Sequence, residues 1–309
     1  MASYLRPSEL PAALEALALG VAEGRPRVVV AGATDHYPAR VGRVADEEIL
    51  DVSGLLELRG IAEVEGGWRI AAGATWTELA GRPLPACFDG LKRAARAIGG
   101  LQIQNRATIA GNVCNASPAA DGIPNLLALE ADVELASGRG MRRVAVADFV
   151  TGNRSTLREP DELVTGLFVP DPAGHGGAGR GDAGRTGAGR GHPGRTGDGM
   201  LATSTFLKLG ARAYLVISIA MVAAVIVRDS QGRITSARLA VGACSPVARR
   251  LPALEAELTG RHLRPGIGDV VRAGHLASLS PIDDVRGTAG YRRDAALVLV
   301  RRALEELAS

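Results

Sequence analysis

The sequence predicts a globular protein of mixed strands and helices, built as two units on either side of a Gly/Arg-rich segment. The chain has 309 residues, of which 46% are hydrophobic, enough to form substantial cores. Short β-branched runs alternate with stretches of helical apolar spacing, which favours mixed strands and helices. The apolar pattern stops over 173–199, where GAGRGDAGRT (177–186) is followed by GAGRGHPGRT (187–196). Because this segment has nothing apolar to bury, we expect a flexible surface insertion.

The first unit, residues 1–172, carries both kinds of pattern in alternation. Helices are predicted where Leu and Ala recur every three or four residues, and strands where β-branched residues cluster. In chain order the segments are a helix over 8–19 with Ser8 as its N-cap, strands over 27–30, 49–52 and 68–72, helices over 75–79, 91–98 and 117–129, and paired strands over 132–135 and 143–146 about a turn at 137–140.

The second unit, residues 200–309, begins with an apolar strand-like segment at 206–211. An uncharged apolar run over 213–227 is shorter than the roughly 20 residues needed to cross a bilayer, so we expect it to be a buried strand or helix. A turn at 229–232 and a strand over 236–241 follow. Helices are expected over 251–258 and 295–307, the latter amphipathic.

Composition excludes several classes of function. With 36 basic and 33 acidic residues the net charge is +3, too balanced for a nucleic-acid-binding protein. Cys87, Cys114 and Cys244 are far apart and form no CxxC pair, which argues against a metal site held by this chain alone. The first residues lack the charged-then-apolar build of a signal peptide. We therefore expect a cytoplasmic protein without a membrane span.

Two segments have the chemistry of a phosphate- and hydroxyl-binding surface. Loop one is VVVAGATDHYP (28–38), in which Gly32 follows a β-branched run and backbone N–H groups can form an anion-binding nest. Loop two is TIAGNVCNASPAADGIP (108–124), rich in small, hydroxyl and amide residues. Neither loop matches GxGxxG or a Walker A motif. Loop one alone is more typical of an ordinary strand-ending turn than of a phosphate site, but together the loops suggest one bound dinucleotide.

Loop two and its flank, IGGLQIQNRATIAGNVCNASPAADGIP (98–124), resemble the signature of the FAD-binding medium subunits of molybdenum hydroxylases, the xanthine dehydrogenase and carbon monoxide dehydrogenase flavoprotein family. The resemblance extends to FLKLGAR (206–212), ARLAVGACSP (237–246) and the segment 282–304. It covers nearly the whole chain except the Gly/Arg-rich insertion.

The resemblance implies a vanillyl-alcohol-oxidase-type (PCMH-type) FAD-binding domain over 1–172, with subdomains at about 1–54 and 55–172, and a small α+β domain over 200–309. It implies that FAD is bound non-covalently. The cofactor-binding residues it implies are Ala31, Gly32, Ala33, Thr34, Asp35 and His36 at the pyrophosphate; Thr108, Gly111, Asn112, Asn115 and Asp121 at phosphate, ribityl and ribose oxygens; Ile98 and Val164 beside the flavin rings; and Lys208 at the flavin's polar edge.

Two positions depart from the family pattern. Ala33 replaces the second Gly of a GGTD loop, and Ala110 replaces the first Gly of an IGGN sequence. Either methyl is tolerable where φ is negative, whereas a positive φ would cost about 1–2 kcal/mol.

The function implied by the resemblance is electron transfer within a complex. A molybdopterin-binding large subunit and a 2Fe-2S small subunit are the implied partners, and NAD+ or another acceptor would receive the electrons. The flavin carries the redox chemistry, so we assign no catalytic acid or base. A stand-alone FAD-dependent oxidase and a flavin-free assembly subunit remain alternatives at this point.

Overall fold

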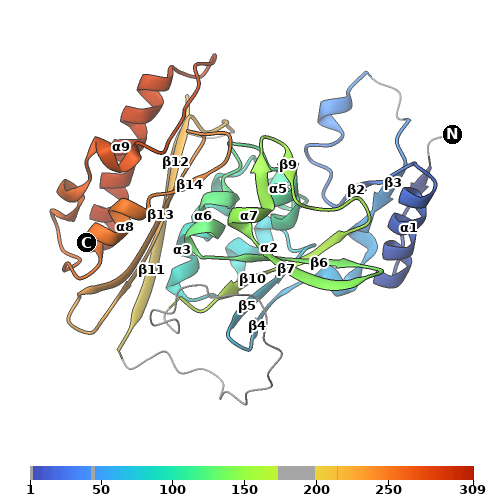
Figure 1. The fold of residues 1–309 in the computed structure, drawn as a ribbon, viewed down its shortest axis with the longest axis horizontal. Helices are drawn as coiled ribbons and strands as arrows, with labels where there is room; N and C mark the ends of the chain where they lie inside the picture. Colours follow the sequence, from blue (N-terminus) through green and yellow to red (C-terminus); the bar gives the residue numbers. More distant parts are fainter. Residues whose placement is uncertain (1–2, 43–45, 173–198, 214) are drawn as a thin grey trace.

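The computed structural model describes residues 3–42, 46–172, 199–213 and 215–309. Figure 1 shows a row of three parts, with the N-terminal sheet and the C-terminal sheet at opposite ends of a central sheet and its helices. The Gly/Arg-rich segment that we predict to be an insertion lies outside the described residues, apart from Gly199.

The N-terminal part is a small parallel sheet in the order β1-β3-β2. Its elements are β1 (Tyr4–Leu5), α1 (Leu10–Ala22), β2 (Val28–Val30) and β3 (Ile49–Asp51). The predicted strands here and the helix are confirmed. The predicted cap is wrong: the N-cap is Glu9, because Pro11 occupies the first turn and sets where the helix begins.

The central part is a five-stranded antiparallel sheet in the order β4-β5-β10-β6-β7. Its strands are β4 (Ile61–Val64), β5 (Gly67–Ala71), β6 (Asp132–Ser137), β7 (Gly140–Ala145) and β10 (Leu163–Pro170), and a separate hairpin comprises β8 (Val150–Gly152) and β9 (Ser155–Thr156). The register Ser137↔Gly140 confirms the predicted hairpin.

The helices of this part are α2 (Trp76–Gly81), α3 (Asp89–Ala97), α4 (Leu101–Gln104), α5 (Ile109–Asn115), α6 (Gly122–Ala128) and α7 (Val146–Phe149). Thr75 begins α2 through a capping box with Glu78, which explains why the predicted helix starts there. The helix predicted over 117–129 is shorter: residues 117–121 form a turn, with the Ala120 N–H donating to the Ser117 carbonyl, and the helix begins at Gly122.

The C-terminal part is a four-stranded sheet of β11 (Leu201–Leu209), β12 (Ala220–Arg228), β13 (Ile234–Gly242) and β14 (Arg249–Arg250), covered on one face by α8 (Pro252–Leu258) and α9 (Ala289–Ala308). Strand β12 is buried on both faces. Met221, Ala223 and Val225 join the core of the central part, whereas the alternate residues pack toward the C-terminal helices.

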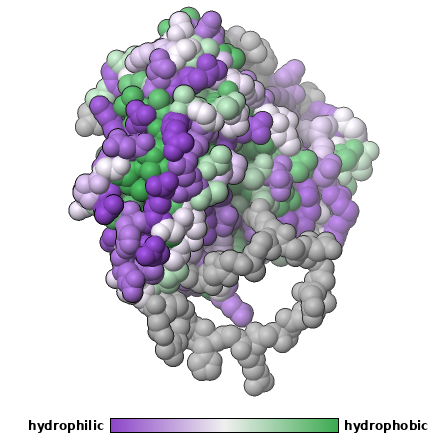
Figure 2. Space-filling view, turned by 60° about the vertical axis from the view of Figure 1, so that its left-hand side comes forward, coloured by the Kyte–Doolittle hydropathy of each residue, from purple (hydrophilic) through white to green (hydrophobic). Residues whose placement is uncertain are grey.

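The apolar run over 213–227, which we expect to be a buried strand or helix, is buried only in its later part. Leu215 and Ile217 are 55% and 60% exposed, and the strand starts at Ala220. Figure 2, in which the left-hand side of Figure 1 comes forward, shows a strip of apolar side chains among hydrophilic ones. Within the described residues no helix is long and apolar enough to cross a membrane. All three cysteines are free thiols.

Candidate functional site

Loop one meets the chain just ahead of loop two through a backbone contact at Gly32. A Cβ built on Gly32 would lie 1.9 Å from the Arg106 carbonyl oxygen and 2.9 Å from the Ala107 Cα. Only a glycine at position 32 lets loop one pack this closely against residues 106–107, and the missing side chain also leaves room for a phosphate.

Loop two is held on its other side by the segment that begins α2. Thr75 and Thr108 form an isolated antiparallel bridge, and the Ile109 N–H donates to the Ala74 carbonyl at 3.1 Å. The Thr108 hydroxyl accepts the Gly111 N–H at 3.0 Å, which fixes the first turn of α5. Gly111 itself is exposed, and a Cβ there would meet only Thr108 Oγ1.

Arg154, in the turn between β8 and β9, joins the two loops. Its Nη1 donates to Asp35 Oδ2 of loop one at 2.8 Å and to Asn115 Oδ1 of loop two at 2.6 Å. The Arg154 N–H donates to the Ala116 carbonyl at 2.9 Å. Sequence reasoning missed this residue, because a lone Arg in a turn between two very short strands carries no motif.

A buried ion pair lies at the other end of loop two. Because side chains alternate along β11, Phe206 and Lys208 face the central part, and Lys208 Nζ lies 2.7 Å from Asp121 Oδ2. Ser218 Oγ donates to Asp121 Oδ1 at 2.6 Å, and Lys208 also donates to the Ala97 carbonyl at 3.3 Å. Burial raises the pKa of the Asp121 carboxyl, and its contacts with Lys208 and Ser218 oppose that rise.

The structure thus brings four of the predicted residues together at two places along loop two. Asp35 and Asn115 meet at Arg154, while Asp121 and Lys208 meet beside Ala97, the neighbour of Ile98. Asn112 Oδ1 accepts the Gly122 N–H at 3.3 Å, within loop two. In loop one, His36 Nε2 lies 3.5 Å from Glu47 Oε2, and burial lowers the pKa of the His36 imidazole. Val164, 4% exposed, lies in the sheet core. The cofactor contacts of these residues stay predictions.

The two Ala departures differ in backbone conformation. Ala33 has φ of 55°, in the left-handed region that favours glycine. Ala110 lies inside α5 and is 3% exposed. Of the two positions, only Ala33 therefore carries the left-handed strain that the sequence raised for both.

We expect Ala33→Gly to raise the free energy of unfolding by about 0.5–1 kcal/mol, because relief of left-handed strain outweighs glycine's entropy cost in the unfolded chain. Urea unfolding of the purified chain measures it. Ala110→Gly is the matched control and should destabilise by about 1 kcal/mol as a helix-interior glycine. If both variants lost the same free energy of unfolding, the result would contradict backbone strain at Ala33.

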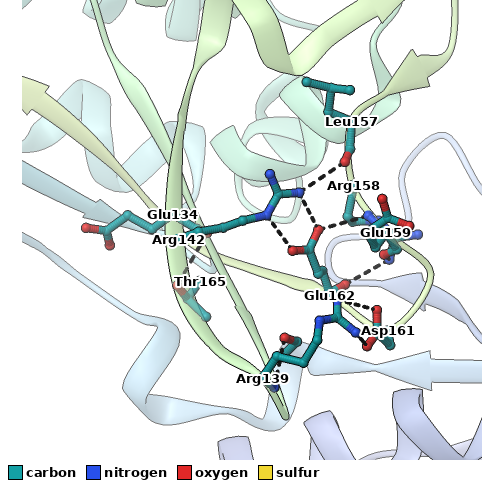
Figure 3. Close-up of polar contacts among 10 residues, drawn as sticks. Glu134, Arg139, Arg142, Leu157, Arg158, Glu159, Asp161, Glu162 and Thr165 are labelled. Carbon is teal, nitrogen blue, oxygen red and sulfur yellow. Dashed lines mark hydrogen bonds and ion pairs between the residues drawn. The ribbon is translucent and has the colours of Figure 1, made fainter. Parts of the chain in front are cut away.

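A surface hollow lies apart from these residues, between the β6–β7 hairpin and the segment 157–162 (Figure 3). Arg142 grips Glu162 with two hydrogen bonds of 2.6 and 2.8 Å, and Arg139 pairs with Asp161. Ion pairing with Arg142 lowers the pKa of Glu162. The charged side chains Arg139 and Arg142 beside the hollow are paired with Asp161 and Glu162, so we assign the hollow a structural role. Among described residues no group of three or more His, Cys, Asp or Glu is placed to hold a metal ion.

Comparison with known proteins identifies both halves of the chain. Residues 1–172 match the family described as "FAD binding domain in molybdopterin dehydrogenase", and residues 205–307 match "CO dehydrogenase flavoprotein C-terminal domain". The xanthine dehydrogenase FAD-binding subunit of Escherichia coli O157:H7 is 36% identical over 190 residues, which cover 57% of this chain and 61% of that subunit. The glyceraldehyde dehydrogenase medium chain of Sulfolobus acidocaldarius is 27% identical over 99% of this chain and 98% of its own length.

Solved structures agree over the full chain. Reconstituted CO dehydrogenase from Oligotropha carboxidovorans superimposes with a TM-score of 0.81 at 25% identity, covering 100% of this chain and 97% of that one. The enzyme from Hydrogenophaga pseudoflava gives 0.79 at 26% identity, covering 99% and 96%. The mixed helix-and-sheet fold is thus that of an FAD-binding domain followed by a flavoprotein C-terminal domain. The chain therefore belongs to the family of FAD-binding medium subunits of the molybdenum hydroxylases, the xanthine and carbon monoxide dehydrogenases.

Proposed function

We propose that this chain is the FAD-binding electron-transfer subunit of a multi-subunit molybdenum hydroxylase. In this proposal it receives electrons from 2Fe-2S clusters on a small partner subunit, which take them from a molybdopterin-binding large subunit, and passes them to NAD+ or another acceptor. Relatives named as medium subunits or chains act on nicotine, glyceraldehyde and carbon monoxide, which supports a shared role for the flavin chain rather than a shared substrate.

The observation that carries the proposal is the meeting of loops one and two. Gly32 brings loop one against residues 106–107, and Arg154 joins Asp35 to Asn115. This places the small residues of loop one next to the segment that leads into α5, and neighbouring backbone N–H groups of that kind suit a pyrophosphate. Gly111 is exposed in the first turn of α5 and carries no side chain, so its backbone is open to a closely bound dinucleotide.

The residues at the far end of loop two would orient the flavin. We propose that Lys208, fixed by Asp121 and Ser218, holds a positive charge at the ring's polar edge, with Ile98 and Val164 as apolar neighbours of the rings. Bound FAD supplies the redox chemistry, accepting electrons and passing them on. We also propose the vanillyl-alcohol-oxidase-type division into subdomains at about 1–54 and 55–172, which follows the separation of the first two sheets.

The absorption spectrum of the purified chain, followed by chromatography of released cofactor, tests the proposal. Non-covalent FAD is the expected result. A chain that takes up no FAD on reconstitution would contradict it and favour the flavin-free assembly subunit. Substrate turnover by the chain without partner subunits would instead favour a stand-alone oxidase.

We expect Gly111→Asp to abolish most FAD binding. The new Cβ would lie 2.8 Å from Thr108 Oγ1, so the cap of α5 must shift to admit it, and the added charge repels a pyrophosphate. Flavin fluorescence titration should give at least a tenfold higher Kd. Gly138→Asp adds the same charge at the β6–β7 turn, where nothing lies within 4 Å, and should bind FAD normally. Normal binding by both variants would refute the loop assignment.

A further inference from the structure

The junction of the two loops contains one carboxylate and one guanidinium. Asp35 lies in loop one, and its side chain is 53% exposed, as is 57% of the Arg154 side chain. A pyrophosphate bound between the loops would lie near the Asp35 charge and be repelled by it. Arg154, at 2.8 Å from Asp35, offsets that charge.

Arg154 also has donors to spare. Its two side-chain contacts, to Asp35 and to Asn115, both use Nη1. A guanidinium carries five N–H donors in a fixed planar fork, and two of them belong to Nη1. The donors on Nε and Nη2 therefore give the same side chain the capacity to reach phosphate oxygens while it holds the loops together.

Backbone strain concentrates at this junction. Among the described residues six non-glycine residues have positive φ, and three of them are Ala33 beside loop one's Thr34, Ala116 beside Asn115, and Arg154 itself at 56°. Each left-handed residue costs of order 1 kcal/mol and persists only where surrounding contacts enforce it. Here the contact is visible, since the Arg154 N–H donates to the Ala116 carbonyl and joins two of the strained residues directly.

We propose that Arg154 is a positioning residue for the pyrophosphate of FAD: it neutralises Asp35 and fixes the spacing of loops one and two. The inference rests on the proposed flavin site and adds to it a residue outside both loops. In its absence Asp35 faces the phosphates unpaired, and the loops lose their side-chain connection.

Variants that remove or keep the charges of Arg154 and Asp35 test the inference through the FAD affinity of the purified chain, measured by flavin fluorescence titration. Arg154→Ala should raise Kd at least tenfold, and Arg154→Lys, which keeps the charge, should recover part of the loss. Asp35→Asn in the Arg154→Ala background should also recover affinity, because the uncompensated carboxylate is gone. The affinity for ADP, measured by competition, should fall in parallel with the affinity for FAD, since ADP contains the same pyrophosphate.

The matched control is Arg139→Ala. It removes an exposed arginine of the turn between β6 and β7 from its ion pair with Asp161 and should leave Kd unchanged. Wild-type Kd in Arg154→Ala overturns the inference, and so does a loss that neither Asp35→Asn nor Arg154→Lys repairs. A loss of FAD affinity without loss of ADP affinity overturns the pyrophosphate assignment. Failure of the wild-type chain to bind FAD is a separate result and overturns the proposed function itself.

Discussion

Replacing Lys208 with Met should lower the free energy of unfolding by about 3–5 kcal/mol, because it leaves a buried carboxylate without its partner. Asp121 is 6% exposed and Lys208 Nζ lies 2.7 Å from it. Met keeps the length and most of the packing of the lysine stem, so the loss reports the charge. Urea unfolding at neutral pH measures it.

The pH dependence of that loss has a definite sign. Burial already raises the pKa of Asp121, and removal of Lys208 takes away an interaction that opposes the rise. In the variant the folded protein therefore binds a proton more tightly than the unfolded chain. Its stability deficit should be smallest near pH 4 and grow as pH rises toward the raised pKa of the folded state.

Two further variants make the result decisive. Asp121→Asn combined with Lys208→Met removes both charges and should be more stable than Lys208→Met alone. Lys92→Met removes a half-buried lysine on α3 and should cost far less. A deficit in Lys208→Met that does not change with pH, or that the double variant does not reduce, would mean that the ion pair is not its cause.

Gly32→Ala should disrupt the junction of the loops and lower FAD affinity at least tenfold. Its Cβ would lie 1.9 Å from the Arg106 carbonyl oxygen, and no side-chain rotation separates the two atoms, because the backbone fixes the position of each. Loop one must then move from residues 106–107, with an overpacking cost of about 1–3 kcal/mol. Fluorescence titration and urea unfolding measure the two effects.

Gly81→Ala is the matched control, since nothing lies within 4 Å of a Cβ at that position in α2. It should bind FAD normally and be unchanged or slightly more stable. An unaltered Kd in Gly32→Ala would show that the close approach of loop one to residues 106–107 does not shape the flavin site.

Much of the local structure follows from sequence alone. The β-branched run before Gly32, the Thr75 cap and the hairpin around 137–140 all depend on interactions between near neighbours in the chain. The composition of loops one and two likewise predicts a dinucleotide-binding pair. The family match over residues 1–172 spans both loops.

Only the tertiary structure determined the contacts between residues that are far apart in the chain. A sequence pattern does not reveal that Lys208 on β11 pairs with Asp121, that Ser218 in an apolar run completes that pair, or that Arg154 reaches both loops. Leu215 and Ile217 are predicted to be buried because their apolarity is a local signal, whereas their exposure depends on where β12 begins. Periodicity encodes which face of an element is apolar, but the partner of a polar side chain is set by the packing of whole elements.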